Sequence, residues 1–116
     1  MSQVSIYHNP RCSKSRQTLA LLQEQGIEPQ VIEYLKDTPD VAQLKDLLSK
    51  LGFVSARELM RSKEDVFKEL ELKNEDDEEK LLAAMAAHPK LIERPIVVKG
   101  QQARLGRPPE AVLEIL

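Results

Sequence analysis

The sequence is poor in the residues that cross-link a chain or hold a metal. It contains one cysteine and two histidines in 116 residues. One cysteine excludes a disulfide within the chain, and one thiol with two imidazoles cannot assemble an ordinary structural zinc site. We therefore expect no metal in this protein.

Long apolar runs and a strong excess of either charge are also lacking. No stretch approaches the roughly 18 apolar residues that a transmembrane helix needs, and no secretory signal pattern precedes Val4. The formal net charge is −2 and the pI is about 5.7, so the chain has no overall basic excess for nucleic acid or an anionic membrane. These features predict a cytoplasmic protein that binds neither nucleic acid nor membrane.

The chain also shows no internal repeat and no Gly/Ser-rich or Pro-rich linker. Its 41% hydrophobic content and its length allow it to bury about two-thirds of the surface that the unfolded chain exposes. We therefore predict one domain over residues 1–116.

The first third of the chain has the pattern of a strand, a helix and a second strand. Val4–Tyr7 alternates between apolar and polar residues, and a helical spacing starts at Ser13 and ends near Gly26. Residues 30–35 are rich in β-branched and aromatic residues and predict the second strand. This order predicts a right-handed parallel unit, with the loop after the first strand at the carboxyl end of the sheet, where α/β proteins usually bind ligands.

Residues 38–88 have helical patterns only and predict a run of about four helices inserted between two halves of a sheet. We expect Thr38 as the N-cap of the first helix with Pro39 at its first position, and Ser62 as the N-cap of a short later helix. The acidic run 75–79 opens the last of these helices, where it complements the helix dipole.

The last part of the chain predicts a hairpin and a helix. Residues 96–98 and 102–105 read as antiparallel strands joined by a tight turn, and a final helix begins at Pro108 with apolar residues turned inward, namely Val112, Leu113 and Leu116. The complete order, βαβ, helical insertion, ββα, is that of a thioredoxin-like α/β fold with a four-stranded mixed sheet. In such folds a cis-proline precedes the third strand. Pro95 takes that place, so we predict a cis Arg94–Pro95 peptide bond.

The segment 8–16 between the first strand and the first helix carries the only cysteine, Cys12. A helix N-terminus offers free backbone N–H groups and the positive end of the helix dipole, which favour an anion. Four basic or imidazole side chains lie within four residues of the sulfur: His8, Arg11, Lys14 and Arg16. Both features lower a thiol pKa, so we predict a reactive thiolate at Cys12.

Spacing separates the possible cysteine chemistries. A phosphatase-type phosphate loop needs an arginine six residues after the cysteine, where this chain has Thr18. A dithiol site needs a second cysteine at position 15, where the chain has Ser15. A monothiol site remains, in which Ser15 and the helix amides donate hydrogen bonds to the thiolate and His8 serves as a charge partner.

Three arginines complete the candidate site. Arg94 precedes the predicted cis-proline and Arg107 lies in a Gly-Arg-Pro loop, so we expect both near Cys12. Arg61 lies at a helix end in the insertion. A guanidinium offers a rigid fork of donors to a tetrahedral oxyanion, and two or three of them together would neutralise its charge.

The motifs His8–Arg16, Glu93-Arg94-Pro95 and Gly106-Arg107-Pro108-Pro109 resemble the glutaredoxin-coupled arsenate reductases, the ArsC family, over essentially the whole chain. The last predicted helix is followed directly by the end of the sequence, whereas resistance-plasmid members carry a longer C-terminal tail. The resemblance is therefore to the short chromosomal type.

This resemblance implies a function for each candidate residue. Cys12 is the nucleophile, His8 assists thiolate formation, and three arginines bind the oxyanion: Arg61, for which Arg57 is the alternative one helical turn away, Arg94 and Arg107. It implies reduction of arsenate to arsenite through a covalent thiol–arsenate adduct on Cys12. Glutathione is then the co-substrate and glutaredoxin the protein partner, with no metal and no tightly bound cofactor.

Two other functions remain open from the sequence. One is an Spx-like regulator that binds RNA polymerase and senses oxidants through a Cys-x-x-Cys motif, against which Ser15 argues because it replaces the second cysteine. The other is a monothiol redox protein that acts on glutathionylated proteins.

Overall fold

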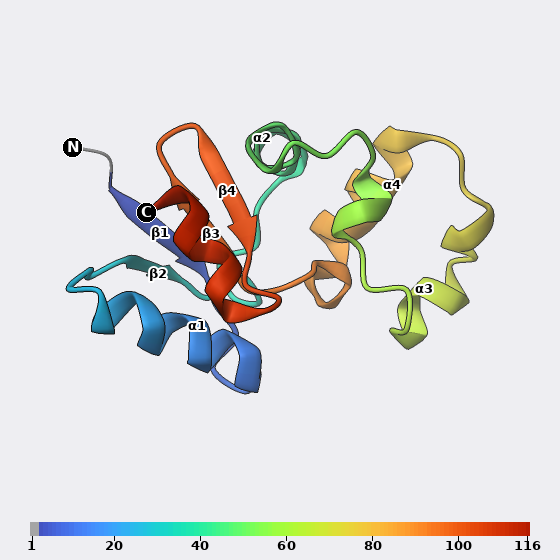
Figure 1. Ribbon diagram of the computed structural model, residues 1–116. Helices are drawn as coiled ribbons and strands as arrows, with labels where there is room; N and C mark the ends of the chain where they lie inside the picture. Colours follow the sequence, from blue (N-terminus) through green and yellow to red (C-terminus); the bar gives the residue numbers. More distant parts are fainter. Residues whose placement is uncertain (1–2) are drawn as a thin grey trace. The chain divides into compact units, whose positions relative to one another are not determined.

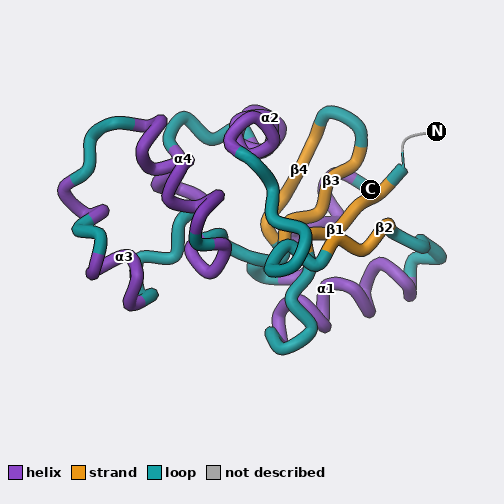
Figure 2. The backbone as a smooth tube through the Cα atoms, turned by 180° about the vertical axis from the view of Figure 1, so that it is seen from behind, coloured by secondary structure: helices purple, strands orange, loops and turns teal. Residues whose placement is uncertain are grey.

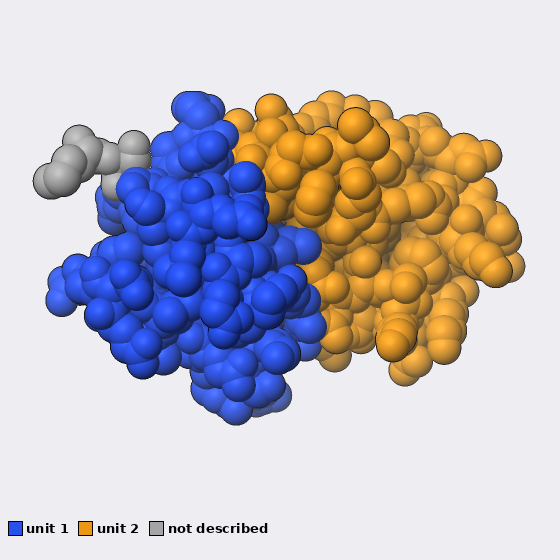
Figure 3. Space-filling view, viewed as in Figure 1, with its two compact units in different colours: residues 1–37, 94–116 blue, residues 38–93 orange. Residues whose placement is uncertain are grey.

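The computed structural model describes residues 3–116, and in it the chain forms two compact units (Figures 1 and 3). The first unit is built from the part of the chain before Thr38 and from Arg94 onward, and the second is Thr38–Glu93. The helices of the second unit lie between Val41 and Leu91.

The first unit contains a four-stranded mixed sheet in the order β2-β1-β3-β4 (Figure 2). Its strands are β1 (Val4–Tyr7), β2 (Gln30–Ile32), β3 (Ile96–Lys99) and β4 (Gln102–Leu105). β1 pairs in parallel with β2 and antiparallel with β3, which pairs antiparallel with β4. The predicted fold class and strand pairing are confirmed. β2 is shorter than predicted because the carbonyl of Glu33 accepts hydrogen bonds from the N–H groups of Lys36 and Asp37, which turns the chain away.

Helix α1 (Ser13–Glu24) and the C-terminal 3₁₀ helix η4 (Pro109–Ile115) pack against this sheet (Figure 1). The core between them consists of six buried side chains: Val4, Ile6, Leu22, Val97, Val112 and Ile115. The prediction that Leu113 points inward is wrong, because its side chain is 41% exposed. A 3₁₀ helix has three residues per turn, so the inward positions recur every third residue, as Val112 and Ile115 do.

The second unit is helical. It comprises α2 (Val41–Leu51), η1 (Ala56–Leu59), α3 (Asp65–Glu69), η2 (Leu72–Asn74), α4 (Glu78–Ala87) and η3 (Pro89–Leu91). Leu44, Leu47 and Leu51 are the buried residues of α2, which contacts α4. No helix within residues 3–116 is long and apolar enough to cross a membrane.

Two predicted helix starts in this unit are wrong. The N-cap of α2 is Asp40, whose carboxylate accepts from the N–H of Gln43 at 2.8 Å while the Gln43 side chain accepts from the N–H of Asp40 at 2.9 Å. This reciprocal capping box satisfies two helix donors, so α2 starts two residues after Pro39. The N-cap of α3 is Glu64, two residues after Ser62 and without a side-chain cap.

The acidic run 75–79 makes contacts within the second unit. Asp77 caps α4 by accepting from the N–H of Glu79 at 2.9 Å. Glu78 accepts from the hydroxyl of Ser55 and the N–H of Ala56. These carboxylates therefore fix the start of α4, and among residues 3–116 no group of three or more His, Cys, Asp or Glu side chains is placed to hold a metal ion.

Candidate active site

Cys12 is the N-cap residue of α1, as the sequence predicted. The chain between β1 and α1 is held by a turn in which the carbonyl of Asn9 accepts from the N–H of Cys12 and its side-chain oxygen accepts from the N–H of Arg11, both at 3.0 Å. Arg16 of the helix donates to the carbonyl of Pro10 at 3.0 Å. These contacts hold Cys12 at the N-terminus of α1, where the first backbone N–H groups of the helix have no partner within the helix.

The surroundings of the Cys12 thiol lower its pKa. The residue is only 9% exposed, and burial by itself raises the pKa because it disfavours the charged thiolate. This effect is outweighed by the backbone N–H of Ser15, the positive charge of Arg94, the backbone N–H of Lys14 and a hydrogen bond from the Arg94 side chain. The surroundings of Cys12 therefore favour the thiolate form that the sequence predicts.

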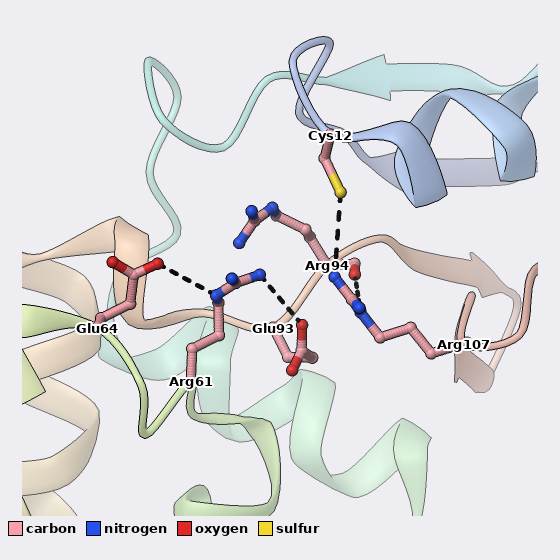
Figure 4. Close-up of polar contacts among 6 residues, drawn as sticks. All are labelled: Cys12, Arg61, Glu64, Glu93, Arg94 and Arg107. Carbon is pink, nitrogen blue, oxygen red and sulfur yellow. Dashed lines mark hydrogen bonds and ion pairs between the residues drawn. The ribbon is translucent and has the colours of Figure 1, made fainter.

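Arg94 and Arg107 both lie at this thiol (Figure 4). Arg107 donates through Nε to the carbonyl oxygen of Arg94 at 2.8 Å, and its Nη2 lies 3.9 Å from the Cys12 Sγ. The Arg94–Pro95 peptide bond is cis, as predicted, and the Arg107–Pro108 bond is also cis, which the sequence did not indicate. The loop before β3 and the loop after β4 thus bring two guanidinium groups to one sulfur atom in a distant part of the sequence.

His8 and Ser15 form a buried pair beneath the same helical turn. The His8 Nδ1 and the Ser15 Oγ are 2.5 Å apart, and the two residues are 6% and 0% exposed. The Ser15 hydroxyl also accepts from the N–H of Asn9 at 3.0 Å. Ser15 therefore acts on the thiolate through its backbone N–H, while its hydroxyl, which we expected at the thiolate, links His8 to the loop.

The protonation state of His8 bears on its predicted role. Burial lowers the pKa of the imidazole below its ordinary value of 6.5, with a smaller opposing effect from the charge of Glu33. The neutral form of His8 is therefore favoured at pH 7. A neutral imidazole is not the charged partner of the thiolate that we predicted from the sequence. Assistance of thiolate formation by His8 stays a prediction, with Ser15 as its contact.

Arg61 belongs to the second unit, where two carboxylates hold it (Figure 4). Its Nε lies 3.3 Å from Glu64 Oε1 and its Nη1 lies 3.5 Å from Glu93 Oε1. Arg57, the alternative to Arg61, donates to the carbonyl oxygen of Glu75. Arg57 thus has a structural partner inside the unit, and the oxyanion role of Arg61 stays a prediction.

Two further residues hold this site together, and no role was predicted for them from the sequence. Asn9 holds the loop before the cysteine, and the Asn-Pro pair at positions 9 and 10 was the available signal. Gly106 donates its N–H to the carbonyl of Pro95 at 2.9 Å, joining the two arginine loops. A glycine directly before Arg107 was the available signal, because glycine permits close approach of two backbones.

Fold and site together define the class of this protein. It has a thioredoxin-like sheet, a single thiol of lowered pKa at the N-terminus of the first helix, and two arginines at the sulfur. The chain belongs to the ArsC family, which matches residues 7–115.

Its relatives agree with this assignment. The chain is 50% identical to the "Arsenate reductase" of Neisseria meningitidis serogroup A, with all of both chains covered. It is 62% identical to the "Uncharacterized protein YfgD" of Escherichia coli K12, over 98% of this chain and 97% of the relative. Among solved structures, "Arsenate reductase from Vibrio cholerae" superposes with a TM-score of 0.97 at 60% identity, covering 99% of this chain and 98% of the other.

Proposed function

We propose that this protein reduces arsenate to arsenite, with glutathione and glutaredoxin as the source of electrons. Membership of the ArsC family and relatives at 50% and 60% identity that bear the name arsenate reductase support the reaction. The observation that carries the proposal is the Cys12 thiol itself, which has a lowered pKa and lies 3.9 Å from a guanidinium nitrogen. A thiolate beside fixed positive charge suits attack on a tetrahedral oxyanion.

In the first step the Cys12 thiolate attacks the arsenic of arsenate. A sulfur–arsenic bond forms while the bond from arsenic to one arsenate hydroxyl group breaks, and that hydroxyl takes up a proton and leaves as water. Arg94 and Arg107 are the groups that can neutralise the charge that gathers on the arsenate oxygens. Arg61 is the third candidate for this role.

In the second step the thiol of glutathione attacks the Cys12 sulfur and gives up its proton. The electron pair of the sulfur–arsenic bond passes to arsenic, so arsenic(V) becomes arsenic(III) and leaves as arsenite. The two thiols are oxidised to a Cys12–glutathione disulfide. A second cysteine to resolve this disulfide is lacking in the chain, so a glutaredoxin thiol takes the glutathione and regenerates Cys12.

This scheme assigns the remaining roles. Glutathione is a co-substrate, and no tightly bound cofactor or metal takes part. The reaction belongs in a reducing compartment such as the cytoplasm, where thiols stay reduced. His8 and Ser15 hold the helical turn whose N–H groups stabilise the thiolate.

The test is arsenate-dependent NADPH oxidation with glutathione, glutaredoxin and glutathione reductase present. We expect turnover by the wild type and none by Cys12→Ser. Arg107→Ala should raise the KM for arsenate at least tenfold, since a charged hydrogen bond contributes about 1.5–3 kcal/mol. Arg104→Ala is the matched control, because Arg104 pairs with Glu114 in the same unit, at 3.0 Å. Full activity of Cys12→Ser would end the proposal.

A further inference from the structure

Gly106 lies in an unusually crowded place. A Cβ atom added to it would lie 2.7 Å from Pro95 Cγ and closer still to Thr18 Oγ1, with Thr18 Cγ2 at 3.1 Å. Ordinary contacts of a Cβ atom start at 3.4 Å. Neither Gly26 nor Gly52 has any atom within 4 Å of the equivalent position. Gly106 is therefore required for close packing, whereas the other two are required for their backbone angles.

The three residues in this contact belong to the three segments that form the site. Thr18 is fully buried on α1, and its hydroxyl donates to the carbonyl of Lys14 at 2.8 Å, in the turn whose N–H groups face the thiolate. Pro95 directly follows Arg94, and Gly106 directly precedes Arg107. The N–H of Gly106 also donates to the carbonyl of Pro95 at 2.9 Å.

We propose that Thr18 and Gly106, with Pro95 also packed against Gly106, are positioning residues that set how closely Arg94 and Arg107 approach the Cys12 sulfur. The catalytic meaning of this contact rests on the proposed function. The positioning itself concerns the thiol and both guanidinium groups, whatever the substrate is.

The geometry makes the contact sensitive to one methyl group. In Gly106→Ala the loop must recede until the new methyl group clears Pro95 Cγ, from 2.7 Å to at least 3.4 Å. The Arg107 Nη2 to sulfur distance of 3.9 Å is already long for a hydrogen bond, so the same displacement breaks it. If Pro95 gives way instead of the loop, Arg94 moves with it, since the two residues are adjacent. The thiolate loses part of its stabilisation, and the Cys12 pKa rises.

The test is a titration of the Cys12 thiolate by its ultraviolet absorbance, with Cys12→Ser as the blank. We expect the ratio of thiolate to thiol at a fixed pH below the pKa to fall about threefold in Gly106→Ala, as the weakened charge interaction implies. The double variant Thr18→Ala with Gly106→Ala should recover part of this ratio, because one of the two obstructing side chains is gone.

Gly26→Ala is the matched control. Gly26 has a φ of 77° and open space around it, so alanine there strains the backbone at the far end of α1 without touching the site. We expect a lower melting temperature and an unchanged titration. If Gly106→Ala does not fold, the double variant is measured in its place, and we expect its ratio of thiolate to thiol to lie below that of the wild type.

A folded Gly106→Ala protein with the wild-type titration would overturn the proposal, as would a double variant that recovers nothing relative to the single one. The titration contains no arsenate. Failure of the positioning role is therefore distinguishable from failure of the proposed reaction.

Discussion

Replacing Arg107 by glutamine removes a positive charge whose Nη2 atom lies 3.9 Å from the Cys12 sulfur. At that separation two unit charges interact by about 1 kcal/mol in a medium like water and by about 4 kcal/mol at an effective dielectric constant of about 20. The Arg107 side chain is exposed, so solvent screening places the value near the lower figure. An interaction of about 1–2 kcal/mol corresponds to roughly a tenfold change in the ratio of thiolate to thiol.

The expected result is therefore a rise of the Cys12 pKa and about tenfold less thiolate at a fixed pH below it. Thiolate absorbance measures this directly, because the chain contains one cysteine. Arg107→Lys keeps the charge and loses the planar fork, so its ratio should lie between those of the wild type and the glutamine variant.

Arg104→Gln is the control for a general change of net charge. Arg104 lies on β4 of the same unit and pairs with Glu114, so we expect the wild-type titration. An Arg107→Gln protein that also titrates like the wild type would refute the assignment of Arg107 to the thiolate.

Further predictions concern stability. Asp40→Ala removes the α2 cap, so it should lower the free energy of unfolding, measured in urea, by about 0.5–2 kcal/mol. Ser49→Ala, on the exposed side of the same helix, should change it by less than about 0.5 kcal/mol. Equal effects of the two substitutions would contradict the capping box. Cys12 has a lowered pKa in the folded state, so its thiolate stabilises the fold fully above the ordinary thiol pKa of about 8.5, and this contribution disappears as the pH falls through the folded pKa. The difference in unfolding free energy between wild type and Cys12→Ser should therefore grow with rising pH, and a constant difference would contradict the lowered pKa. Leu22→Ala should lower the free energy of unfolding by about 2–5 kcal/mol, and Leu113→Ala by less than about 1 kcal/mol, because Leu22 is fully buried and Leu113 is exposed. Thermal unfolding measures both values, and equal values would contradict the 3₁₀ packing of η4.

The sequence contained enough to predict the sheet and the place of the thiol. Alternation in Val4–Tyr7 and the helical spacing after Ser13 are local patterns, and they fix Cys12 as the residue between strand and helix. The positions of Arg94 and Arg107 beside prolines then pointed to two loops at the same edge of the sheet. Local pattern and topology agree here, so the fold class was predictable from the sequence.

Helix starts were harder because the insertion contains competing signals. Thr38-Pro39 and Asp40-x-x-Gln43 both satisfy a capping pattern, and α2 begins at the second, where Asp40 and Gln43 form a reciprocal capping box. The orientation of Leu113 was predicted wrongly for a related reason. Pro109 at the first helical position suits an α-helix and a 3₁₀ helix equally, and the two helices bury different residues.

The inner contacts of the site depend on tertiary packing and have no local pattern. The pairing of His8 with Ser15 joins residues seven positions apart across a strand end and a helix. The contact of Gly106 with Thr18 joins residues at opposite ends of the chain. A one-dimensional pattern gives residue types and spacings, whereas these contacts depend on how α1 and two loops pack against the sheet.

A single turnover with arsenate and glutathione in the absence of glutaredoxin, followed by intact-protein mass spectrometry and arsenite determination, tests whether the reduction passes through Cys12. The mechanism predicts one glutathione bound through Cys12 for each arsenite released, and no such adduct when arsenate is left out or when Cys12 is serine. Arsenite formed without a glutathione adduct on Cys12, or an adduct that forms equally well without arsenate, would contradict it.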